Sequence, residues 1–230
     1  MPIDSIMPFL AVAVALFGAV PMVMNRRSPN IREAWSVAAA TLMFLFVLHM
    51  IPPVLAGNTL NYTLFSLAPG VSFSFRVDAM GVLFAVTASF LWILTTFYSI
   101  GYMRSLKEHA QTRYYLCFML TMSATIGVAF AANLLTLYLC YELVGVCAYP
   151  LVVHNETEEA YAKGNKYIFY LFGMAKLFLL ACFISYGLSD TLDFKPGGVF
   201  PADVDKNLLT ITFFLFVIGV GAKAAIMPLH

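Results

Sequence analysis

The sequence predicts an all-α membrane protein with about seven transmembrane helices, and three observations lead to this fold class. Hydrophobic residues make up 61% of the 230 residues and charged residues only 11%, less than half the charged share of an ordinary soluble domain. Seven apolar runs are each close to the length that a helix needs to cross a hydrocarbon core of about 30 Å. Nearly all charged residues lie between these runs or at their ends.

The apolar runs follow one another with polar connections. They cover residues 3–24, 34–55, 79–102, 114–132, 134–153, 167–188 and 207–229. The first run has neither a preceding basic segment nor a small-residue cleavage signature, so we expect a retained span rather than a signal peptide. The second run ends around Pro52 and Pro53, which interrupt helical hydrogen bonding. The fourth and fifth runs are separated by Asn133 alone, which predicts a tight connection.

The connection between the second and third runs has a different pattern. Polar and apolar residues alternate on both sides of Ala68-Pro69-Gly70, and this period of two predicts a short β-hairpin outside the hydrocarbon. Asp78 stands at the head of the third run, where its side chain is expected to cap the helix.

The distribution of basic residues predicts the orientation of the chain. The first, third and fifth connections hold eight Lys and Arg residues, whereas the amino terminus and the other connections hold three. Because cytoplasmic loops carry the excess of basic residues, the odd-numbered connections are expected in the cytoplasm. The amino terminus and the hairpin are then extracytoplasmic, and the carboxyl terminus is cytoplasmic.

Three charged residues remain inside the apolar runs: Glu142, Lys176 and Lys223. Glu142 and Lys176 each lie near the middle of a run, so both are expected close to the bilayer midplane. A charge at that depth costs several kcal/mol unless it is partnered, which makes each residue a candidate functional site. Lys223 lies nearer to the cytoplasm if the last run forms a continuous helix.

The last run contains Gly219 and Gly221 before Lys223, and Pro228 after it. Since proline removes a helical hydrogen bond and glycine loosens the backbone, the seventh helix is predicted to be broken near its end. Broken helices at membrane depth are tolerated where they line a hydrated cavity. Ordinary glycine packing between helices explains the same spacing and stays an alternative.

An acid and an amine at one depth form a candidate proton-transfer element. A lysine beside a carboxylate keeps its proton, whereas a lysine left alone in a low dielectric tends to release it, so moving either group acts as a switch. The alternative is a static ion pair that holds helices together. Snorkelling toward the cytoplasmic surface is a further alternative for Lys223, but Lys176 has roughly ten apolar residues on either side and is too far from both surfaces.

Segments 78–103, 137–152 and 219–230 together resemble the antiporter-like subunits shared by respiratory complex I, membrane-bound hydrogenases and Mrp-type cation/proton antiporters. The resemblance implies that the glutamate of the fifth helix, Glu142, and the lysine of the broken seventh helix, Lys223, drive proton movement. It implies that His230 takes part in a hydrated relay. Lys176 has no fixed place in the family motif, so its role depends on its position alone.

The resemblance also implies a domain organisation. An amino-terminal three-helix region with the hairpin would cover residues 1–112, and an incomplete first antiporter-like repeat would cover residues 113–230. Subunits of this family have about fourteen helices with two inverted repeats, so the rest is expected either on a separate chain that completes a split subunit or on the remainder of a longer protein.

The predicted function is therefore a proton-translocating membrane subunit of a multisubunit respiratory or antiporter complex in a prokaryotic inner (cytoplasmic) membrane. The alternatives are a sodium/proton antiporter module and a truncated structural or assembly subunit with no conducting path. Expected partners are other membrane subunits, the lipid bilayer, and protons or Na⁺; with no basic cluster, no nucleic-acid partner is expected.

No cofactor and no metal site are expected from the sequence. It contains no dinucleotide fingerprint, no haem motif and no cysteine set for an iron–sulfur cluster, so any redox chemistry would belong to partner subunits of an NADH-quinone oxidoreductase-like complex. The four cysteines lie inside apolar runs without Cys-x-x-Cys spacing. They are expected to be small core residues rather than disulfides or metal ligands.

Overall fold

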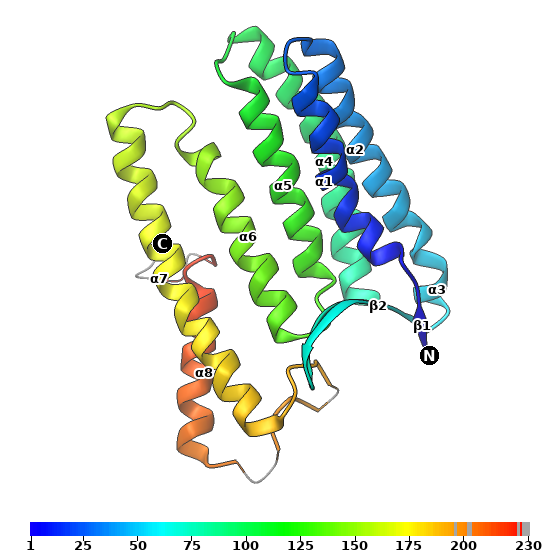
Figure 1. Ribbon diagram of the computed structural model, residues 1–230, viewed down its shortest axis with the longest axis vertical. Coiled ribbons are helices and arrows are strands. Elements are labelled where there is room, and N and C mark those ends of the chain that lie inside the picture. Colours follow the sequence, from blue (N-terminus) through cyan, green and yellow to red (C-terminus); the bar gives the residue numbers. More distant parts are fainter. Residues whose placement is uncertain (196, 202–203, 225, 227–230) are drawn as a thin grey trace.

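Long helices stand side by side in the computed structural model, with a small sheet at one end (Figure 1). It describes residues 1–195, 197–201, 204–224 and 226. The helices are α1 (Met7–Met24), α2 (Pro29–His49), α3 (Ile51–Leu55), α4 (Ala79–Ser105), α5 (Gln111–Ala129), α6 (Leu134–Val152), α7 (Glu158–Ser189) and α8 (Lys206–Gly221).

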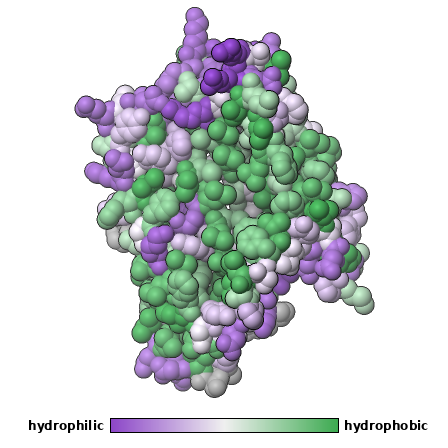
Figure 2. All heavy atoms as spheres, in the orientation of Figure 1, coloured by the Kyte–Doolittle hydropathy of each residue, from purple (hydrophilic) through white to green (hydrophobic). Residues whose placement is uncertain are grey.

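Five helical segments of the described chain are long and apolar enough to cross a membrane: Met7–Met24, Pro29–Leu55, Ala79–Ser105, Leu134–Val152 and Glu158–Ser189. α8 is a shorter apolar helix of 16 residues, and α5 begins with the polar residues Gln111, Thr112 and Arg113. The chain is thus a mostly helical, multi-pass membrane protein. Apolar atoms cover much of the visible face and hydrophilic atoms gather toward its ends (Figure 2). Spans by α5 and α8, and the orientation, stay predictions.

Several helix boundaries differ from the predicted ones. α7 begins at Glu158, well before the apolar run, because the Thr157 side chain caps it. Glu158 and Glu159 lie in its first turn, where negative charge interacts favourably with the helix dipole. α1 begins only at Met7 because Pro2–Asp4 form a β-strand before it. α8 ends at Gly221, so the polypeptide leaves the helix inside the last apolar run.

The sheet contains the two strands of the hairpin and one further strand. β2 (Thr59–Ala68) pairs antiparallel with β3 (Val71–Val77), and Gly70 between them has a positive φ of 72°. β1 (Pro2–Asp4) pairs parallel with the start of β2, which the sequence did not predict because three residues carry no detectable period. Asp78 accepts a hydrogen bond of 2.8 Å from the backbone N–H of Gly81, which confirms it as the cap of α4.

Buried side chains form two clusters. The larger one joins α1, α2, α4 and α5 to the sheet, and Tyr115, Met119 and Ile126 contribute α5 to it. The smaller one lies between α6 and α7, around Tyr138 and Phe178. α5 also packs against α6. The division at residue 112 stays a prediction, since α5 packs with the amino-terminal helices as well as with the helix that follows it.

Candidate functional site

The depth of α6 is set by Asn133, which is fully buried at its start. The Asn133 carboxamide oxygen accepts a hydrogen bond of 2.8 Å from the N–H of Thr136, and its NH₂ group donates to the carbonyl of Ser72 at 2.8 Å. One side chain therefore caps α6 and ties it to the hairpin. Glu142 follows eight residues after the first residue of the helix, about 12 Å along its axis.

Glu142 and Lys176 form an ion pair between α6 and α7. Lys176 Nζ lies 3.9 Å from a carboxylate oxygen of Glu142 and donates a hydrogen bond of 3.3 Å to the hydroxyl of Tyr138. Tyr138 and Glu142 are four residues apart and so share one face of α6. The Glu142 side chain is only 15% exposed, whereas that of Lys176 is 59% exposed. The distance between the paired groups is thus long, and the lysine side chain is exposed.

Lys223 lies beyond the end of α8, in a turn closed by a hydrogen bond of 3.2 Å from its N–H to the carbonyl of Val220. Its ammonium group donates to the backbone carbonyl of Tyr141 and lies 3.5 Å from the centre of the Tyr141 ring. The Tyr141 hydroxyl donates to the carbonyl of Gly219 at 3.2 Å. Tyr141 therefore holds both the end of α8 and the amine that follows it.

The position of Lys223 differs from the one expected for a continuous helix. α8 rises from the end of the molecule that carries the sheet and stops at about mid-height of α6 and α7 (Figure 1). Its 16 residues extend only about 24 Å, less than the hydrocarbon core. Because the helix ends early, Lys223 reaches α6 one residue from Glu142 instead of lying near the cytoplasmic surface.

One carboxylate therefore has two amines in its neighbourhood, one from α7 and one from the segment after α8. Both Lys176 and Lys223 lie within electrostatic range of Glu142. Among the described residues Glu142 has an ion pair with Lys176 only, while Lys223 is bound by a neutral carbonyl and a ring. Chemically, such a group can exchange ion-pair partners with small side-chain movements. His230 lies outside the described residues, so its predicted role stays a prediction.

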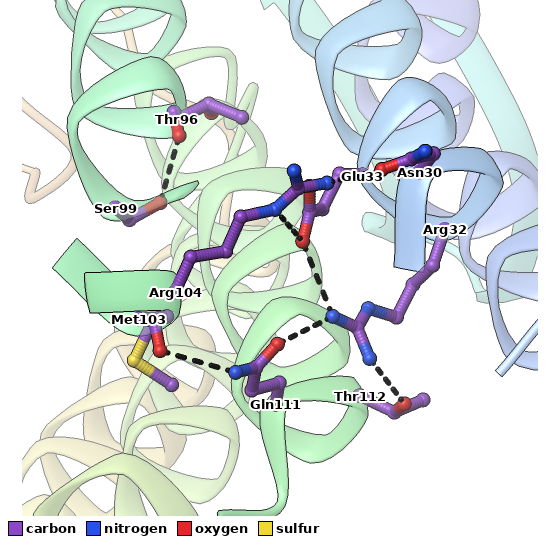
Figure 3. A network of polar contacts seen from close by, with 9 residues as sticks. All are labelled: Asn30, Arg32, Glu33, Thr96, Ser99, Met103, Arg104, Gln111 and Thr112. Carbon is purple, nitrogen blue, oxygen red and sulfur yellow. Dashed lines mark hydrogen bonds and ion pairs between the residues drawn. The ribbon is translucent and has the colours of Figure 1, made fainter. Parts of the chain in front are cut away.

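A second cluster of charged residues was not predicted from the sequence. Arg32 and Glu33 were assigned to a polar connection, yet their side chains are only 6% and 4% exposed. Glu33 accepts from Arg32 and from Arg104 of α4, and Arg32 also donates to Gln111 at 2.6 Å (Figure 3). The cluster thereby joins α2, α4 and α5 near one end of the bundle. One feature of the sequence could have placed Arg32 and Glu33 in a helix. Pro29 precedes them, and proline is a common first helical residue; α2 does begin there.

The four cysteines, Cys117, Cys140, Cys147 and Cys182, are all buried and free. Their burial confirms the expectation that they are core residues.

Two family models match the chain. The model described as "NADH:quinone oxidoreductase/Mrp antiporter, TM" matches residues 131–230. The model described as "NADH-Ubiquinone oxidoreductase (complex I), chain 5 N-terminus" matches residues 67–115. The first match contains α6, α7 and α8, and so it contains Glu142, Lys176 and Lys223.

Curated relatives include subunit A1 of Na(+)/H(+) antiporters. The protein of Staphylococcus haemolyticus is 28% identical over 233 residues, which cover 97% of this chain and 28% of that protein. The protein of Staphylococcus aureus is 30% identical over 151 residues, which cover 64% of this chain and 19% of the relative. The chain therefore spans less than a third of the length of these relatives.

Three solved structures share the fold. A chain of the membrane-bound sulfane sulfur reductase, an archaeal respiratory membrane complex, has a TM-score of 0.86 at 19% identity, with 98% of this chain and 46% of that chain covered. A chain of respiratory complex I from Thermus thermophilus has 0.71 at 18% identity, covering 96% and 45%. A chain of the Mrp complex from Dietzia sp. has 0.68 at 18% identity, covering 96% and 42%.

Proposed function

The chain is an antiporter-like membrane subunit, related to those of complex I and of Mrp antiporters, and from this premise we propose that it helps to move protons across a prokaryotic inner membrane. The observation that supports the proposal is that Lys176 pairs with Glu142, while the ammonium group of Lys223 binds the backbone carbonyl of Tyr141, the residue next to Glu142. One acid near two amines suits a switch, because either amine can hold the carboxylate while the other is free to release a proton.

The switch works by exchange of ion-pair partners. When the Glu142 carboxylate moves from Lys176 toward Lys223, Lys176 loses its counter-charge. It then gives up its proton to water, either directly or by a relay in which the Tyr138 hydroxyl takes this proton and passes its own to water. The return movement restores the first pair after Lys176 regains a proton. Moving one charge against 100 mV requires about 2.3 kcal/mol, which lies within the range of the free-energy changes on making or breaking a poorly solvated ion pair.

The exposure of Lys176 supports a multisubunit setting. More than half of its side chain is open in the isolated chain, and an ammonium group in contact with hydrocarbon is unfavourable by several kcal/mol. In the assembly, further protein or a water-filled path therefore covers this side of α7. We propose other membrane subunits, or a further part of the same subunit, as the covering partners.

Replacing Glu142 by Gln tests the function in the assembled complex. Proton translocation by reconstituted vesicles should collapse while the complex still assembles. The amide keeps the shape of the side chain, but because it is neutral it cannot form an ion pair with either lysine. Glu159→Gln on the exposed first turn of α7 is the matched control and should transport normally. Unchanged transport by Glu142→Gln would show instead that the chain is an architectural subunit.

A sodium/proton antiporter module is the second candidate, because the curated relatives are named Na(+)/H(+) antiporter subunits. Sodium prefers several oxygen ligands, and Glu142 is the single carboxylate that the sequence places near the middle of an apolar run. The two candidates differ in one measurement. If pH-gradient formation in vesicles persists when K⁺ replaces Na⁺, the proton proposal holds; strict dependence on Na⁺ would establish the antiporter.

A further inference from the structure

Two connections at the end of the bundle opposite the sheet bring an acid and two histidines together. Glu108 and His109 lie between α4 and α5, and His154 lies between α6 and α7. A Glu108 carboxylate oxygen is 3.7 Å from His109 Nδ1 and 3.9 Å from His154 Nε2. One ligand atom from each residue lies within 4.8 Å of the others, and the two imidazole rings stack with centroids 4.9 Å apart.

The imidazole of His154 lacks the partners that a buried ring needs. Its side chain is only 14% exposed, and neither ring nitrogen has a hydrogen-bond partner among the described residues. Buried polar atoms are normally paired with protein, water or an ion. Since Glu108 and His109 are more open, at 28% and 49% side-chain exposure, the cluster is reachable from solvent on one side.

The charges around the cluster leave room for a cation. Arg113 is a basic residue beside His154, and it is bound to Glu156 and to the backbone carbonyl of His154. Glu156 thereby balances the guanidinium charge, whereas the Glu108 carboxylate has an ion-pair contact only with the two imidazoles among the described residues. Glu108 is thus available to balance a bound cation.

We propose that Glu108, His109 and His154 form a binding site for a divalent transition metal of the zinc type. Two imidazole nitrogens and one carboxylate oxygen are ligands that zinc prefers, whereas Mg²⁺ and Ca²⁺ prefer all-oxygen sites. Ligand bonds of about 2 Å in a tetrahedron place donor atoms about 3.3 Å apart. The ligand atoms, which lie within 4.8 Å of one another, would draw together by at most about 1.5 Å to reach that value, and a fourth position would stay open to water.

Bound metal would join two parts of the molecule. Glu108 and His109 follow α4, and His154 follows α6, so one ion would tie the amino-terminal helices to the helices that carry Glu142 and Lys176. This site was not predicted, because its ligands come from connections far apart in the sequence and match no metal-binding spacing. The site is separate from the proposed proton switch, so each proposal can fail without the other.

Zinc binding to the full protein, purified with its assembly partners in detergent and freed of any affinity tag, tests this site. Equilibrium dialysis against Zn²⁺ followed by elemental analysis should give one tightly bound ion per chain. His109→Gln and Glu108→Gln should each weaken binding at least about tenfold. His49→Gln is the matched control, because His49 is the last residue of α2 and lies at the end of the bundle away from the proposed site. Glu142→Gln should also bind zinc normally.

Two results would overturn the site. Unchanged zinc binding by both His109→Gln and Glu108→Gln would place any bound zinc elsewhere, and these side chains are exposed enough that the variants should fold even if His154→Gln does not. Displacement of Zn²⁺ by an equal concentration of Mg²⁺ would contradict ligation by imidazole nitrogens. Co²⁺ bound in place of Zn²⁺ should show the visible absorption of a tetrahedral centre, which His109→Gln should abolish.

Discussion

At the residue scale, the buried Glu33 and the partly buried Glu142 are held in opposite ways. Glu33 accepts from the guanidinium groups of Arg32 and Arg104, so its charge is compensated by several hydrogen bonds at once. Glu142 has one ion pair, at 3.9 Å. A carboxylate held by several short hydrogen bonds is fixed, whereas a carboxylate held by one long ion pair can move. This difference favours a structural role for Glu33 and a transport role for Glu142.

Glu33→Gln should therefore destabilise the protein strongly. Loss of the carboxylate leaves Arg32 as a buried, uncompensated charge, which costs on the order of 3 kcal/mol. The apparent melting temperature of the purified protein in detergent measures the effect. Glu159→Gln, which removes an exposed pair with Lys163, should lower stability by less than about 0.5 kcal/mol. Equal melting temperatures for the two variants would show that the Glu33 network contributes no more than a surface pair.

At the element scale, close packing of α8 on α7 sets the position of Lys223. A Cβ atom on Gly219 would lie 2.6 Å from the backbone nitrogen and 2.9 Å from the Cα of Phe178. Only glycine permits this approach, because backbone atoms of α7 cannot turn aside as a side chain can. The packing interpretation of the glycines is thus supported at Gly219, while α8 also ends at Gly221. The glycines thus accompany both close packing between helices, at Gly219, and the early end of the helix, at Gly221.

Gly219→Ala should push α8 away from α7 and so displace Lys223 from Tyr141. We expect a loss of stability of about 1–3 kcal/mol together with reduced proton transport, measured as melting temperature and as vesicle acidification. Gly173→Ala is the matched control, since nothing lies within 4 Å of a Cβ atom at that helical position. A Gly219→Ala protein with unchanged melting temperature and transport would contradict the role of this contact.

At the scale of the whole molecule, the chain has a polar end with charged clusters and a sheet-bearing end, separated by apolar helices (Figure 2). The buried network around Glu33 and the cluster of Glu108, His109 and His154 both involve the connections that basic residues predict to be cytoplasmic. The hairpin anchors α6 at the other end through Asn133. The exposed side of α7 and α8, with Lys176, is the surface that other parts of an assembly are expected to cover.

Matched cysteine substitutions at two exposed serines test the orientation. Ser105→Cys, at the end of α4, should react with a membrane-impermeant maleimide only from the cytoplasmic side. Ser66→Cys, in the hairpin, should react only from the outside. The four native cysteines are buried, so the background labelling of the unaltered protein should be low. Labelling of Ser66→Cys from the cytoplasm would reverse the predicted orientation.

The sequence by itself determined the class of protein, the approximate position of each long helix, the hairpin pattern and the cap at Asp78. These features depend on local hydrophobicity and turn chemistry, which neighbouring residues specify. It also isolated Glu142, Lys176 and Lys223, because charges are rare inside apolar runs. It missed the buried state of Arg32 and Glu33, since residues beside a proline in a polar stretch give no sign of what will pack over them.

The tertiary structure decided which of these groups meet. The pairing of Glu142 with Lys176, the contact of Lys223 with Tyr141, and the meeting of His154 with Glu108 and His109 all join segments far apart in the chain. Such contacts depend on where α8 ends and on how α6 packs between α5 and α7. Packing between helices sets these distances, and a single sequence carries no local signal for them.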